Sequence, residues 1–146
     1  MKKRLKSLSL ATLTLLAVAS CKNSDVDPRE QYTGSYNITT TQYSKGTNGA
    51  SATEVYKFNL YVSKGKSSDE LVFKDDDDTY TVTMKNNTFE IPAHTTSIFY
   101  NGSTYAVKTV GNGSFAGNSI NLNTVTGLSI QGITVTITKA GNGPKF

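Results

Sequence analysis

The chain has 146 residues and a formal net charge of +4, from 15 Lys and Arg against 11 Asp and Glu. Four of these cations lie in the first six residues, and all 11 acids come later, so 15 − 4 = 11 cations balance 11 acids beyond residue 20. This balance excludes the clustered positive charge with which nucleic-acid-binding proteins neutralise phosphates. One cysteine excludes an internal disulfide, and one histidine excludes a histidine-based metal cluster.

The first twenty residues have the pattern of an export signal. A basic segment at residues 1–6 precedes an apolar run at residues 8–18, which Ser and Thr interrupt at three positions. A membrane-spanning helix needs about 20 predominantly apolar residues. The run is about half that length, so the sequence predicts a signal peptide at residues 1–20 and no permanent transmembrane helix.

The end of this segment, Val18-Ala19-Ser20-Cys21, resembles the lipobox of bacterial lipoproteins. The resemblance implies that Cys21 receives lipid and becomes the first residue of the mature chain, held to a membrane by two or three acyl chains. An ordinary secretory peptide with an incidental cysteine is the alternative. Lipidation accounts for an unpaired thiol in an exported protein, so we expect an anchored protein whose Cys21 is unavailable for catalysis.

Residues 21–30 are expected to form a flexible tether, because they are polar, contain a proline and show no periodicity. Lys22, where an aspartate would indicate inner-membrane retention, favours the outer membrane. Asp25 and Asp27 loosely resemble the surface-export signal of Bacteroidota lipoproteins, although a solvated linker has the same composition. The membrane is thus an expected partner. The domain is expected either on the periplasmic face of the membrane or on the cell surface.

Residues 31–146 are predicted to form a single all-β domain. Thr, Val, Ile, Tyr and Phe alternate with polar residues, Gly and Asn separate the runs, and no segment keeps helical spacing over three turns. Asn86-Asn87 is expected to form a hairpin turn, because Asn tolerates positive φ. The expected strands cover residues 35–43, 54–63, 71–74, 80–84, 89–91, 104–110, 113–116, 119–125 and 133–138.

About eight strands with short connections predict an antiparallel meander, which removes its edges by closing into a barrel. A two-sheet β-sandwich is the alternative. The Gly34-Ser35-Tyr36 opening, the strand end at residues 89–92 and the hairpin at residues 113–122 resemble the small lipocalin-like lipoproteins of Bacteroidota. This resemblance, which covers most of the mature chain, implies a lipocalin-like barrel.

Tyrosines are the first candidate site residues. Tyr36, Tyr56, Tyr80 and Tyr105 share the predicted inward register, and a tyrosine can pack its ring while its hydroxyl meets a partner. They would line a pocket for a small apolar or amphipathic ligand if the interior is partly empty. An eight-stranded barrel can also be filled by side chains alone, and the tyrosines would then belong to the core.

Two polar features are candidates for a metal site or a catalytic site. Asp75, Asp76, Asp77 and Asp78 offer hard oxygen ligands for calcium, but the ligand spacing of an EF-hand is missing, and a solvated turn explains them as well. Pro92 should end a ladder or occupy an edge or bulge, which places His94 in a polar loop. No catalytic residues and no cofactor are predicted, so an enzyme is the least favoured class.

Two functions remain. The first is a membrane-anchored, non-enzymatic binding module with a lipocalin-like barrel and a small hydrophobic ligand. The second is a structural or adhesive envelope protein with a filled sandwich core and a protein or glycan partner.

Overall fold

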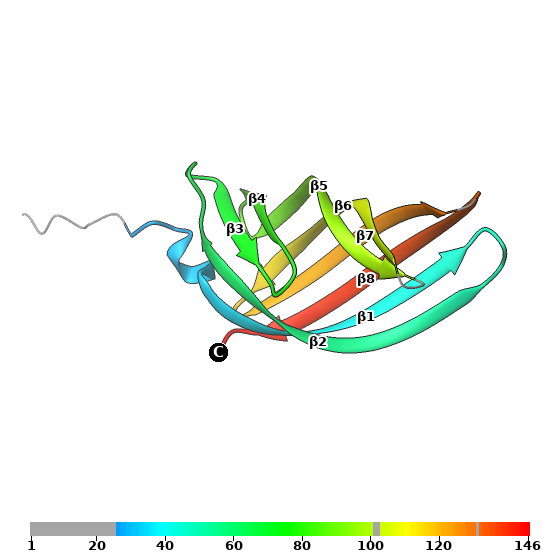
Figure 1. The fold of residues 1–146 in the computed structure, drawn as a ribbon. Helices are drawn as coiled ribbons and strands as arrows, with labels where there is room; N and C mark the ends of the chain where they lie inside the picture. The colour runs from blue at the N-terminus through cyan, green and yellow to red at the C-terminus, as the bar shows by residue number, and fades with distance from the viewer. Residues whose placement is uncertain (1–25, 101–102, 131) are drawn as a thin grey trace, which may run out of the picture.

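A computed structural model describes residues 26–100, 103–130 and 132–146. Eight antiparallel strands follow each other around a closed barrel, and β1 pairs with β8 to complete it (Figure 1). The predicted all-β meander and its closure are confirmed, and the sandwich alternative is wrong. The predicted signal peptide, the lipidation site Cys21 and the first half of the tether lie outside the described residues.

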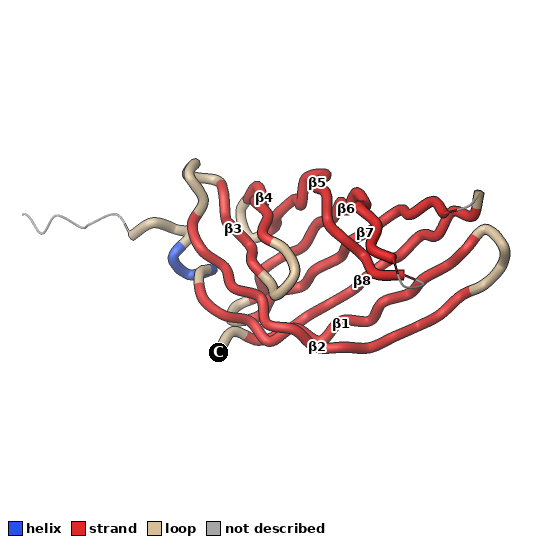
Figure 2. The backbone as a smooth tube through the Cα atoms, in the orientation of Figure 1, coloured by secondary structure: helices blue, strands red, loops and turns tan. Residues whose placement is uncertain are grey.

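Strands make up nearly all of the described chain, apart from one short 3-10 helix, η1, at Glu30–Tyr32 (Figure 2). The described residues contain no helix of the length and hydrophobicity that a membrane crossing requires. The strands are β1 Gly34–Gly46, β2 Ser51–Lys64, β3 Glu70–Lys74, β4 Thr79–Lys85, β5 Thr88–Tyr100, β6 Ser103–Ala116, β7 Ser119–Ile130 and β8 Ile133–Pro144.

The alternation in the sequence separates an inner from an outer face. On β7, Ile120 and Leu122 are buried while Asn121 and Asn123 are exposed. The same alternation gives β1 a buried Ile38 between two exposed polar residues. Side chains on a strand point to opposite faces in turn, so the apolar set fills the interior and the outer surface is mainly polar.

The end of the barrel beside η1 is closed by a packed core. Phe115 lies at its centre, with ring centroids 4.4 Å from Tyr32, 5.9 Å from Tyr36 and 5.3 Å from Phe89. The Tyr36 hydroxyl donates a hydrogen bond to Tyr32 O at 2.8 Å, and burial raises the pKa of Tyr36 to about 12. The ring of Tyr32 in η1 therefore packs over Phe115 and closes this end of the barrel.

Contact with the barrel begins earlier than the predicted boundary at residue 30. Arg29 Nη1 donates to the backbone oxygens of Gly65 at 3.2 Å and Glu70 at 3.1 Å, and also to Ser67 O. The Asp27 carboxylate accepts hydrogen bonds from the Arg29 side chain at 3.0 and 2.7 Å, which lowers the pKa of Asp27 to about 2. The last four residues of the predicted tether are thus part of the folded domain.

Two ladders stop halfway along the barrel. The β2–β3 ladder covers only Tyr61–Lys64 of β2, and the β4–β5 ladder covers only Thr88–Glu90 of β5. β3 and β4, with 5 and 7 residues, are far shorter than their neighbours and turn back at Asp75–Asp78. Beyond them, β2 and β5 continue with a paired neighbour on one side only (Figure 1).

Pro92 lies at an irregularity of the sheet, as expected. The β5–β6 register shifts between Ile91 and His94, which accommodates a residue without an amide donor. The prediction of a loop after Pro92 is wrong, because β5 resumes after the bulge and carries His94. The expected strands at 104–110 and 113–116 form one strand, β6.

Candidate functional site

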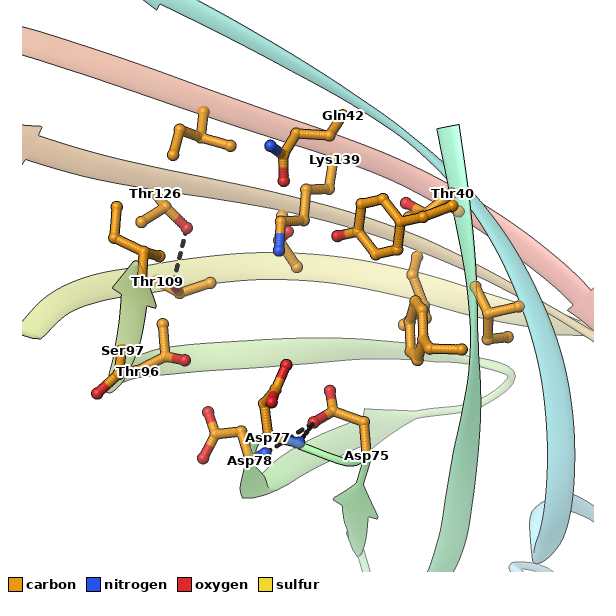
Figure 3. A pocket seen from close by; sticks show the side chains of 18 of the residues that line it. Thr40, Gln42, Asp75, Asp77, Asp78, Thr96, Ser97, Thr109, Thr126 and Lys139 are labelled. Atoms are coloured by element: carbon orange, nitrogen blue, oxygen red, sulfur yellow. Dashed lines mark hydrogen bonds between the residues drawn. The ribbon is translucent and has the colours of Figure 1, made fainter. Parts of the chain in front are cut away.

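The half of the barrel away from η1 holds a cavity of about 600 Å³. Its wall carries the buried hydroxyl pair Thr109 and Thr126, whose oxygens are 2.7 Å apart (Figure 3). These hydroxyls satisfy each other, which lets polar groups be buried there at low cost. The apolar lining residues come from five strands: Ile38, Phe58, Ile98, Leu122, Leu128, Val135 and Ile137.

The four tyrosines predicted for a pocket are divided between the two halves of the barrel. Tyr56 and Tyr80 line the cavity. Tyr36 does not, because it is 1% exposed in the core beside Phe115. Tyr105 is not part of the lining either, although it is half-buried and faces Ile98 across the β5–β6 ladder. The inward register was correct, but register alone does not give the depth of a side chain along the barrel axis.

One wall of the cavity is rich in hydrogen-bond donors that the sequence reasoning missed. Thr40 on β1 faces Tyr56 on β2, and Gln42 on β1 faces Lys139 on β8. We call these four side chains the donor wall. Gly141 follows two positions after Lys139, and a side chain there would press against the Thr40 hydroxyl. The sequence could have predicted that Lys139 points inward, since it continues the inward register of Val135 and Ile137.

The acidic run forms the turn between β3 and β4 at the edge of the cavity (Figure 3). Asp75 Oδ1 accepts hydrogen bonds from the backbone amides of Asp77 at 3.0 Å and Asp78 at 2.7 Å, so this carboxylate shapes the turn. Burial raises the pKa of Asp75. Among the described residues, no three His, Cys, Asp or Glu side chains are grouped as metal ligands. The geometry therefore adds no support to the calcium hypothesis.

His94 connects β5 to this acidic turn. Its ring stacks on Tyr80, with centroids 4.5 Å apart, and burial raises the pKa of Tyr80. Nδ1 lies 3.1 Å from Pro92 O, and Nε2 lies 3.2 Å from Asp78 Oδ2. That carboxylate oxygen is buried and accepts no hydrogen bond from the described residues. Both ring nitrogens face acceptors, and a neutral imidazole donates through one of the two nitrogens.

We expect His94→Leu to lower the free energy of unfolding by about 1–3 kcal/mol, because the Asp78 carboxylate loses the imidazole nitrogen 3.2 Å away and Tyr80 loses the ring stacked on it. Chemical denaturation of the single variants and of His94→Leu with Asp78→Asn measures the coupling. A double variant as stable as Asp78→Asn alone would agree with a direct contact. Strictly additive losses would show that the two side chains act independently.

No protein-family model and no curated protein matches the chain. Among solved structures, it is similar to Ail, the attachment invasion locus protein of Yersinia pestis, with a TM-score of 0.46 and 9% sequence identity. The similarity covers 78% of this chain and 99% of that chain.

Proposed function

We propose that the chain is a non-enzymatic, lipid-anchored envelope protein that binds a small amphipathic ligand inside its barrel. The cavity carries this proposal. At about 600 Å³ it falls within the roughly 300–1,000 Å³ of ordinary ligand sites. Its lining combines apolar side chains, among them Ile38, Phe58 and Leu122, with many polar and charged ones, so it suits a ligand that has both apolar and polar parts.

The contacts of His94, the one histidine of the chain, favour a binding role over catalysis. Both nitrogens of His94 already face structural acceptors, Pro92 O and Asp78 Oδ2. A general base must present a free nitrogen to its substrate or to the nucleophile that it activates. The ring therefore supports the turn and the cavity wall.

We propose the N-terminal lipid as the means of attachment, with the outer membrane as its location. A barrel that crosses a bilayer presents an apolar band of about 25 Å to the lipid. The outward residues of this barrel are mostly polar, as Asn121 and Asn123 show on β7. A polar exterior together with the lipobox-like motif at Cys21 supports anchoring by acyl chains.

Anchoring is tested by Cys21→Ala. We expect the variant to lose incorporation of radiolabelled palmitate completely and to leave the membrane fraction. Ser20→Ala, which keeps a small residue before the cysteine, is the control and should retain both. Continued labelling of the Cys21→Ala protein would overturn the assignment.

Ligand binding is tested by filling the cavity. Thr124 lines it, whereas Thr136 is an exposed residue on β8. We expect Thr124→Phe to remove any co-purifying small molecule that mass spectrometry detects in the parent protein, and to weaken octanol binding at least tenfold. Thr136→Phe should leave both unchanged. Equal binding by the parent and Thr124→Phe would place the ligand elsewhere.

A further inference from the structure

We propose that the cavity selects an amphipathic zwitterion, with its anionic group on the donor wall and its cationic group at the acidic turn. The inference rests on the proposed function and names the charge pattern of the ligand. It follows from the placement of Lys139 and the Asp75–Asp78 turn on opposite sides of one cavity.

The donor wall presents polar groups that the protein itself does not use. Thr40 is 3% exposed and lines the cavity, and its hydroxyl has no side-chain hydrogen bond to any described residue. The Lys139 ammonium forms no ion pair with a described carboxylate and lies 5.6 Å from the centroid of the Tyr56 ring. A donor that faces a cavity and has no protein partner is free to donate to a ligand or to water. A carboxylate or similar anion fits this wall, because ammonium, amide and hydroxyl groups all donate to it.

The acidic turn supplies the complementary charge. Asp75 is committed to the backbone of its own turn, and Asp78 faces His94. Asp77 lines the cavity, and its carboxylate makes no ion pair with a described side chain. An ammonium group placed beside Asp77 gains a charge-assisted hydrogen bond.

The two charged regions lie on opposite sides of the ring of strands. β8 lies next to β1 and β7, whereas the acidic turn joins β3 to β4. Figure 3 shows Lys139 and Gln42 across the cavity from Asp75, Asp77 and Asp78. The lining contains five carboxylates, one of them Glu54, and two lysines, so a simple anion meets net repulsion. A simple cation leaves Lys139 without a partner, and a zwitterion satisfies both sides.

Three probes of equal chain length separate these possibilities: octanoate, octylamine and 8-aminooctanoate, which carries its two charges at opposite ends of the chain. Calorimetric titration uses the purified chain in lipid nanodiscs, with empty nanodiscs as the blank. We expect 8-aminooctanoate to bind at least tenfold more tightly than either of the others, because a charge-assisted hydrogen bond is worth about one to two orders of magnitude in affinity.

Two variants assign the charges. Lys139→Met should weaken the binding of 8-aminooctanoate and octanoate about tenfold without weakening that of octylamine, and Asp77→Asn should weaken the binding of 8-aminooctanoate and octylamine. The controls are Lys45→Met and Glu90→Gln, two exposed residues outside the cavity lining. They should change none of the affinities.

Equal affinity of the three probes would overturn the zwitterion proposal and leave the ligand-binding function intact. So would unchanged binding of 8-aminooctanoate by both cavity variants. Failure of all three probes to bind would overturn the ligand-binding function as well.

Discussion

Phe73→Ala is expected to lower the free energy of unfolding by about 3–5 kcal/mol, the range found when a large buried aromatic side chain is truncated. Phe73 is fully buried, and its ring lies 5.0 Å from Phe89 and 5.8 Å from Tyr80. It packs between the core at the closed end and a tyrosine that lines the cavity. Its loss would leave a void that the rigid ring of strands closes only in part.

Urea denaturation followed by circular dichroism measures this change. Tyr61→Ala is the matched control, since Tyr61 is a large aromatic residue with 46% exposure, and it should cost under about 1 kcal/mol. A Phe73→Ala loss as small as that of the control would show that the core is not packed as described.

Gly113→Ala is expected to destabilise the barrel by about 1–3 kcal/mol or more, although the change adds only one methyl group. A Cβ at Gly113 would overlap Asn121 O and lie 2.7 Å from Phe89 Cε2. The backbone oxygen belongs to the neighbouring strand, and the ring belongs to the core, so neither can move alone. The methyl group would force the β6–β7 ladder and Phe89 apart.

Gly127→Ala is the control, because nothing lies within 4 Å of its added Cβ and its φ is not positive. We expect it to be neutral or to stabilise the protein by a few tenths of a kcal/mol, since alanine restricts the unfolded chain. Thermal unfolding of both variants measures the difference. Equal melting temperatures would contradict the close approach at Gly113.

The alternation of the sequence predicted most of the strands, and the short connections between them predicted the closed barrel. Asn86, expected in a hairpin turn, has a φ of 58°. Pro92 was expected at an edge or bulge, and a register shift surrounds it. Each of these features depends on local chemistry, which is why single residues predicted them. The continuation of β5 after Pro92 depends on pairing with β6, a long-range contact that no local pattern reports.

The site was harder to predict, because it depends on how far each strand extends along the axis. Tyr36 and Tyr56 share an inward register, yet one fills the closed end and the other lines the cavity. Lys139 was not singled out, since a lysine between threonine and alanine looks like a solvated position. Its inward orientation followed from alternation with Ile137, but its proximity to Gln42 required the closure between β1 and β8.

The interrupted ladders of β2 and β5 also affect how long a ligand can be. Lys57 on β2 and Ser97 on β5 are exposed residues, yet both contribute to the lining of the cavity. The cavity therefore reaches the surface sideways between these two strands, above the Asp75–Asp78 turn, as well as along the axis. If a ligand binds as proposed, one end can enter the cavity while the other stays outside, so the volume of the cavity limits only the part of the ligand that is held.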